Sequence, residues 1–147
     1  MTQFLARVLE HIHGHVGWLA ALALAHPAVL LRRPRRNALT VALAATVLVT
    51  AATALGAFLY PHYRTTIKPA LFAATPVVGE LFERKEHLGV AALVLAWTGL
   101  GALALARRRD EAAVDLGRLA FVAYTGAAVT ALFVASAGLV VGAHRSF

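Results

Sequence analysis

Histidine is the residue type in this chain that can support the most kinds of chemistry. The sequence holds seven histidines and no cysteine. Neutral imidazole binds haem iron, zinc and copper, and it exchanges protons near neutral pH. The lack of cysteine excludes disulfides, iron–sulfur clusters, c-type haem attachment and thiolate zinc sites. The histidines stand at His11, His13, His15, His26, His62, His87 and His144.

The segments that must position these histidines are strongly apolar. Of the 147 residues, 60% are hydrophobic, more than the roughly 45–50% found in soluble domains. A bilayer core of about 30 Å takes about 20 helical residues. The sequence therefore predicts an all-α integral membrane protein, a four-transmembrane-helix bundle that forms one domain over 1–147. The predicted transmembrane helices cover about 12–31, 38–60, 87–106 and 118–143, and an external, partly helical segment covers 61–86.

Two arginine-rich loops predict how these helices are oriented. Four arginines fall within 32–36 and four within 107–118. Cytoplasmic loops are rich in Lys and Arg, so both termini and the segment 61–86 are expected outside, across a bacterial inner membrane. The net charge of +7 is attributed to this topology and not to nucleic-acid binding, because no stacking aromatics accompany the arginines. The first span runs straight into an arginine block, so we expect a retained helix and not a signal peptide.

Residues outside the histidine groups predict two local features. Thr75 and Pro76 are typical of a helix start, as cap and first helical residue, so one helix is expected to follow them through to Ala106. Gly138 and Gly142 lie about one turn apart in the last span. Small residues let helices approach closely, either within a bundle or against partner subunits.

With this orientation, six of the seven histidines lie near the external ends of the helices. Three interpretations stay open. The first is that they cap helices and meet lipid head groups, and the second is a haem b held by two histidines from different helices. The third is a zinc or copper site at His11, His13 and His15. The metal site requires an extended segment, because a helix spreads alternate residues around its axis.

For haem, His15 and His87 form the predicted ligand pair, because each opens an outside-to-inside span at a similar depth. Glu83 precedes His87 by about one helical turn. Its carboxylate is expected either to hold the His87 ring or to make an ordinary surface contact. Further candidates are His62 and His144 as ligands, and Arg64, Lys68 and Arg145 as cations for the haem propionates.

His26 lies about 16 Å deeper than His15 on the same helical face. A titratable group inside lipid suggests a function. One interpretation is structural, with His26 bonded to a polar residue of a facing helix, and the other is a quinone contact or a haem shared with a partner chain. The polar residues available for the structural role are Thr46, Thr98 and Tyr124.

Two short motifs stand out along the chain. One is His11-Ile12-His13-Gly14-His15 with the later His26-Pro27, and the other runs from Tyr60-Pro61-His62-Tyr63-Arg64 to Phe82-Glu83-Arg84-Lys85-Glu86-His87-Leu88. These motifs resemble uncharacterised bacterial families of four-helix membrane proteins, several of which are suspected to be b-type cytochromes. The resemblance implies membrane electron transfer or membership of a respiratory assembly.

The functional prediction is a membrane subunit of a respiratory or other electron-transfer assembly that binds haem b near the external face. The alternative is a cofactor-free accessory subunit that packs against other membrane subunits through Ala/Gly-rich faces and stabilises a larger complex. Transport is disfavoured, because the apolar core of each span lacks Asp, Glu, Lys and Arg. Enzymatic chemistry is not indicated, because no nucleophile–base pair or phosphate-binding loop is recognisable.

Overall fold

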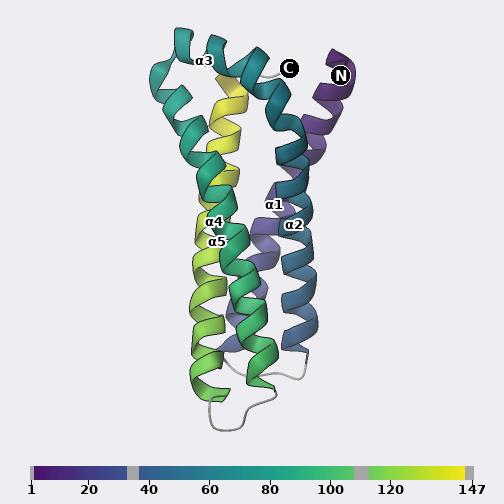
Figure 1. Ribbon diagram of the computed structural model, residues 1–147, viewed down its shortest axis with the longest axis vertical. Helices are drawn as coiled ribbons and strands as arrows, with labels where there is room; N and C mark the ends of the chain where they lie inside the picture. Colours follow the sequence, from purple (N-terminus) through teal and green to yellow (C-terminus); the bar gives the residue numbers. More distant parts are fainter. Residues whose placement is uncertain (1, 33–36, 108–112, 145–147) are drawn as a thin grey trace.

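Long helices dominate the structure (Figure 1). The computed structural model describes residues 2–32, 37–107 and 113–144. In chain order the elements are α1 (Gln3–Leu31), α2 (Ala38–His62), the π-helix η1 (Tyr63–Ile67), α3 (Lys68–Ala74), α4 (Pro76–Ala106) and α5 (Ala113–His144). Within the described ranges, four helical stretches are long and apolar enough to cross a membrane. The predicted all-α bundle of four membrane-spanning helices is therefore confirmed.

Local sequence signals explain where two of the helices begin. The first span extends outward to Gln3, because the side chain of Thr2 caps α1 and accepts a hydrogen bond from the Leu5 amide at 3.4 Å. α4 begins at Pro76, directly after Thr75, as predicted. The Thr75 side chain makes no capping hydrogen bond. Proline, which suits the first helical position, is therefore the effective start signal for α4.

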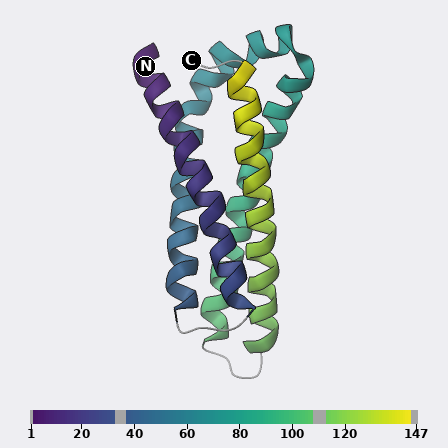
Figure 2. The ribbon, with the colours of Figure 1, turned by 180° about the vertical axis from the view of Figure 1, so that it is seen from behind.

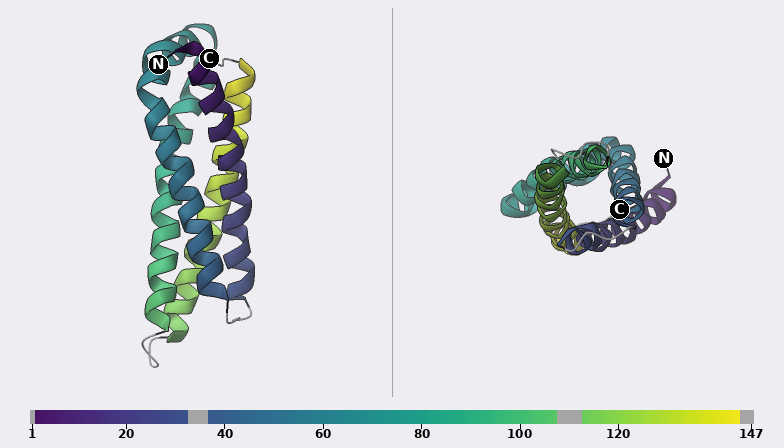
Figure 3. Two further views of the ribbon diagram at one scale, coloured as in Figure 1. Left: turned by 90° about the vertical axis from the view of Figure 1, so that its right-hand side faces the viewer. Right: turned by 90° about the horizontal axis from the view of Figure 1, so that it is seen from below.

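The four long helices run antiparallel as two pairs, α1 with α2 and α4 with α5. α1 also packs along α5, and α2 packs less extensively along α4. The start of α1, the short helix α3 and the end of α5 lie together at what we call the terminal end (Figures 1 and 2). The opposite end, where Arg32 and Arg107 close α1 and α4, is called the arginine end. Seen along the bundle the helices form a ring (Figure 3), and the two pairs diverge toward the terminal end.

Alanine fills the core of the bundle toward the arginine end. Each long helix contributes a fully buried alanine: Ala21, Ala42, Ala96 and Ala127. Such small side chains let helix backbones approach closely, which is the usual basis of packing where lipid removes the hydrophobic force between helices.

Tyr124 joins three helices within this core. It is fully buried, and its hydroxyl lies 3.1 Å from the Ala42 carbonyl and 2.9 Å from Thr46 Oγ1. A Cβ placed on Gly99 of α4 would lie 2.8 Å from the Tyr124 ring. Glycine is therefore required at position 99, because any side chain there would displace the tyrosine.

The segment between α2 and α4 folds over the terminal end. Ile67 of η1 packs with Ala6 of α1. Leu71 of α3 packs with Phe82 of α4 and Val141 of α5. The first cluster fixes this segment to the α1–α2 pair and the second fixes it to the α4–α5 pair.

Candidate functional site

A large cavity lies between the two helix pairs toward the terminal end. Its volume is about 1180 Å³, above the roughly 300–1,000 Å³ of ordinary ligand pockets. α1 and α2 form one wall and α4 and α5 form the other, and we call this cavity the slot. Its lining includes exposed residues, Leu19 of α1 and Leu139 of α5 on one side, and Ala57 of α2 and Val90 of α4 on the other. The slot therefore reaches the outer surface between the pairs.

Glycines keep both walls of the slot free of side chains. Five glycines of the lining have no other atom within 4 Å of the position that a Cβ would occupy: Gly14, Gly17, Gly89, Gly138 and Gly142. Glycine in a helix interior costs about 1 kcal/mol relative to alanine. Close helix packing, the role expected of Gly138 and Gly142, does not explain these residues within this chain. Their common effect is to leave the slot wide.

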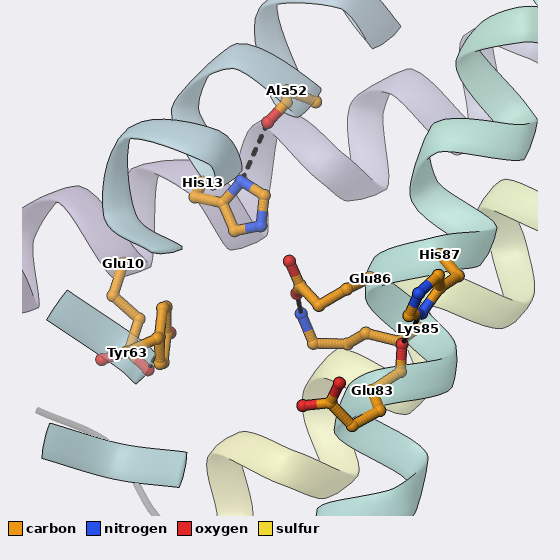
Figure 4. A network of polar contacts seen from close by, with 8 residues as sticks. All are labelled: Glu10, His13, Ala52, Tyr63, Glu83, Lys85, Glu86 and His87. Carbon is orange, nitrogen blue, oxygen red and sulfur yellow. Dashed lines mark hydrogen bonds and ion pairs between the residues drawn. The ribbon is translucent and has the colours of Figure 1, made fainter. Parts of the chain in front are cut away.

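His13 brings an imidazole ring into the slot. Its Nδ1 bonds the Ala52 carbonyl of α2 at 3.1 Å, and its Cε1 would lie 2.9 Å from a Cβ on Gly56. A carbonyl only accepts hydrogen bonds, so Nδ1 carries the proton and Nε2 keeps its lone pair. Figure 4 shows Nε2 on the side of the ring that faces Glu86 and Lys85. His13 therefore presents a ligand nitrogen to the slot.

A lysine and a glutamate of α4 lie across the slot from His13 (Figure 4). Lys85 forms an ion pair with Glu86, and the Lys85 side chain is only 12% exposed. The Lys85 ammonium also lies 4.9 Å from the centre of the Phe82 ring, a cation–π distance. Both charges interact electrostatically with the His13 ring. The polar part of the slot thus contains an imidazole, an ammonium and a carboxylate.

Contacts across the helix pairs close the slot at the terminal end. The Tyr63 hydroxyl of η1 donates a hydrogen bond to Glu10 Oε1 of α1 at 2.8 Å, and its ring lies 5.6 Å from the Phe82 ring of α4. Lys68 of α3 forms an ion pair with Glu83 of α4. Residues of α1, η1, α3 and α4 are therefore joined at this end.

The predicted pair His15 and His87 lies at the rim of the slot. Both side chains are exposed. His15 Nδ1 bonds the His11 carbonyl, and His87 Nδ1 bonds the Glu83 carbonyl, each at 2.8 Å and within its own helix. Neither ring crosses to another helix. The Glu83 carboxylate, predicted to hold the His87 ring, pairs with Lys68 instead.

The remaining haem candidates lie outside the slot. His62 faces a separate hollow of about 320 Å³, which Phe58, Pro61 and Thr65 also line. His144 is exposed, and its Nδ1 bonds the Val140 carbonyl of its own helix at 2.8 Å. The three cations that were predicted to neutralise the haem propionates lie in different places. Arg64 is exposed on η1, Lys68 pairs with Glu83, and Arg145 lies outside the described residues.

The predicted zinc or copper site at His11, His13 and His15 is not formed. The three residues lie on the continuous helix α1, so His13 projects away from the other two. Across the described parts of the chain, no group of three or more His, Asp or Glu residues is placed to hold a metal ion. The helical conformation is the physical reason why this interpretation fails.

His26 lies exposed on the surface of α1, nearer the arginine end. The expected bond to a facing helix is wrong, because the three candidate partners bond elsewhere. Thr46 and Tyr124 bond each other, and Thr98 bonds the Val94 carbonyl of its own helix. His26 therefore lies on the outer surface of the bundle, outside the lining of the slot.

Comparison of the chain with protein-family models, curated protein sequences and solved structures finds no match. The resemblance to four-helix bacterial membrane proteins therefore stays a prediction.

Proposed function

We propose that this chain is a haem b protein of the bacterial inner membrane, a subunit of a respiratory or other electron-transfer assembly. The haem would lie in the slot, near the external face. The observation that carries the proposal is His13, whose Nδ1 is held by the Ala52 carbonyl and whose Nε2 faces the slot. Ligating histidines usually donate their other ring N–H to a carbonyl or carboxylate, which fixes the tautomer and the ring orientation.

The shape of the slot suits a planar, largely apolar group. Its walls belong to different helix pairs, and glycines on both walls leave space against the backbone. Haem supplies one-electron chemistry when it is bound, whereas the protein supplies the ligand, the orientation and the electrostatics. In this chain His13 would bind the iron, and the apolar walls would exclude water.

The charge distribution supports an external location for the slot. Arg32, Arg107 and Arg118 are exposed at the arginine end, and positive charge accumulates on the cytoplasmic side of membrane proteins. The terminal end, with both chain ends and the slot, would then face the outside of the cell. A soluble redox partner there would reach the haem edge without crossing the membrane.

An absorption spectrum of the purified protein in detergent tests the proposal. We expect stoichiometric haem and the visible absorption of a protein-bound b-type haem. His13→Ala should lower the haem content by more than about tenfold, whereas the matched variant His26→Ala, at an exposed position outside the slot, should keep it. Circular dichroism of both variants checks that they remain helical. A colourless wild-type protein from cells well supplied with haem would contradict the proposal and favour the accessory-subunit alternative.

A further inference from the structure

We infer that the inner part of the slot, beyond the histidines toward the arginine end, is a binding site for a hydrocarbon chain of a bilayer lipid, which enters between α2 and α4. This inference goes beyond the proposed function. It is independent of what His13 binds, because it concerns a different part of the lining.

The charged residues and histidines of the slot lining lie toward the terminal end. On α1 they end at His15 and on α4 at His87, and none of the described residues that α2 and α5 contribute is charged or a histidine. The Thr53 hydroxyl bonds the Val49 carbonyl of its own helix at 2.9 Å. Apolar cavities stay free of water and take up apolar molecules. The inner part of the slot consists of the lining residues within 17–20, 49–53, 89–92 and 131–135.

The openings of the slot lie at the depth of the lipid chains. Arg32 and Arg107 mark the arginine end of α1 and α4. With a rise of about 1.5 Å per residue, Leu19 lies about 20 Å from Arg32 along its helix, and Val90 lies about 26 Å from Arg107. Both distances fall within a bilayer core of about 30 Å. The exposed lining at these positions therefore borders hydrocarbon and not water.

The opening between α2 and α4 is the entrance that the packing favours. α2 packs less extensively along α4 than α1 packs along α5. The small side chain of Ala57 borders this opening, whereas the leucines Leu19 and Leu139 border the opposite one. About two helical turns closer to the arginine end, Trp97 Nε1 of α4 donates a hydrogen bond to Thr50 Oγ1 of α2 at 3.2 Å. This contact joins the two helices and sets the inner limit of the entrance.

Glycines of both walls leave space in the inner part of the slot. Gly17 of α1 and Gly89 of α4 have no other atom within 4 Å of the position that a Cβ would occupy. Side chains that border a gap lose dispersion contacts on that side. A hydrocarbon chain restores these contacts and needs no hydrogen bond, so it suits a lining without charge. The surrounding bilayer supplies such chains at the depth of the entrance.

Tryptophan fluorescence tests the inference. The sequence has two tryptophans. Trp18 lines the inner part of the slot, whereas Trp97 is half exposed on the surface of α4. The protein is reconstituted into phosphatidylcholine vesicles whose acyl chains carry bromine, which quenches tryptophan on contact, and into unbrominated vesicles as reference.

We expect brominated lipid to quench Trp18 about as strongly as Trp97. Trp97→Phe keeps only Trp18, and Trp18→Phe keeps only the lipid-exposed Trp97. Each variant is compared with itself in unbrominated vesicles, so any quenching by a bound haem cancels. Emission from Trp18 that brominated lipid leaves unchanged, while Trp97 is quenched, would overturn the inference.

Substitutions in the Trp97→Phe background show whether the quenching chain lies in the slot. Gly89→Leu places a side chain in the inner part and should remove most of the quenching of Trp18. Gly101→Leu, at an exposed glycine outside the lining, should leave it unchanged. Equal quenching in these two variants would mean that lipid reaches Trp18 from the outer face of α1, and would overturn the inference.

A second pair of variants keeps the test valid if Gly89→Leu does not fold. Ala57→Phe narrows the entrance from an exposed position and should lower the quenching of Trp18. Ala54→Phe, also exposed on α2 but outside the lining, should not change it. Circular dichroism checks that each variant remains helical, and equal quenching in this pair would again overturn the inference.

Haem content, measured by absorption on the same preparations, separates this inference from the proposed function. A protein without haem in which Trp18 is quenched would contradict the haem proposal and support the lipid site. A protein with haem in which brominated lipid does not quench Trp18 would support the haem proposal and overturn the lipid site.

Discussion

The two ends of the bundle are built from the same four helices, yet they pack in opposite ways. Toward the arginine end, Gly99 lies directly against the Tyr124 ring, and alanines bring the backbones together. Toward the terminal end, five of the glycines that line the slot have no side chain within 4 Å of the position that a Cβ would occupy. Small residues therefore do not close a bundle by themselves. A side chain such as Tyr124, which fills space and bonds across helices, decides where the bundle is closed.

The two ends also differ in the charge and the burial of their polar groups. Thr46 and Tyr124 are uncharged, fully buried and bonded to each other. The polar groups of the slot include His13, Lys85 and Glu86, which are only partly buried and in part charged. We therefore expect stability to depend mainly on the arginine end and ligand binding mainly on the terminal end. Substitutions that change stability without changing ligand binding, or the reverse, test this comparison between the two ends.

The largest effect on stability is expected from Gly99→Leu. The added side chain would collide with the Tyr124 ring, and overpacking of this kind costs up to about 3 kcal/mol. The free energy of unfolding in mixed detergent micelles measures the loss. Gly101→Leu is the matched control, because Gly101 is exposed and a Cβ there meets nothing within 4 Å. Equal stability of the two variants would refute the close packing assigned to Gly99.

A smaller loss is expected from Tyr124→Phe. This variant keeps the ring but removes the bonds to Thr46 and the Ala42 carbonyl. Hydrogen bonds between membrane helices are worth about 1 kcal/mol, so the free energy of unfolding should fall by that amount. Thr98→Val serves as control, because the Thr98 hydroxyl bonds only a carbonyl of its own helix. A larger loss in the control would show that Tyr124 does not join the helices as described.

At the terminal end, Gly138→Ala should stabilise the protein slightly. The Cβ enters open space, and alanine is favoured over glycine in a helix by up to about 1 kcal/mol. The bulkier Gly138→Leu should occupy part of the slot and lower haem retention while the protein stays folded. Gly101→Leu, outside the slot, should retain haem fully. Normal haem content in Gly138→Leu would place the haem somewhere other than the slot.

The smallest effect is expected from Lys68→Met at the terminal end. Lys68 and Glu83 form an ion pair in which each side chain is about 30% exposed. Pairs near the surface contribute about 0.5 kcal/mol and are screened by salt. The difference from wild type should therefore shrink when unfolding is repeated at high salt. A loss that is independent of salt would mean that Lys68 acts through packing, for example on Phe72, whose ring centre lies 5.9 Å from its ammonium.

Much of the fold follows from the sequence alone. The four spans and the start of α4 at Pro76 both depend on properties that are local in the chain. Span length is set by the thickness of the bilayer core, and helix starts depend on neighbouring residues. None of these features requires knowledge of how one helix is rotated against another.

The site depended on that rotation. Successive residues of a helix are about 100° apart, so His11 and His15 share one face and His13 lies on the opposite one. The sequence determines this relation but not which face is inward. Ala6, His13 and Ala20 follow one another at a spacing of seven residues, about two helical turns, so the three share one face of α1. Ala6 and Ala20 are both buried, so this face is the inward one. Two small apolar residues on the face of His13 were the signal that the sequence offered.

What the sequence by itself determined is the set of helices and the end of the bundle at which most histidines gather. Only the tertiary structure decided that His13 turns inward while His15 and His87 stay at the rim, and that Glu83 pairs with Lys68. The physical reason is that hydropathy and capping act along one helix, whereas a ligand site depends on helix rotation and spacing. Packing between distant segments, such as Tyr124 against Gly99, sets both quantities.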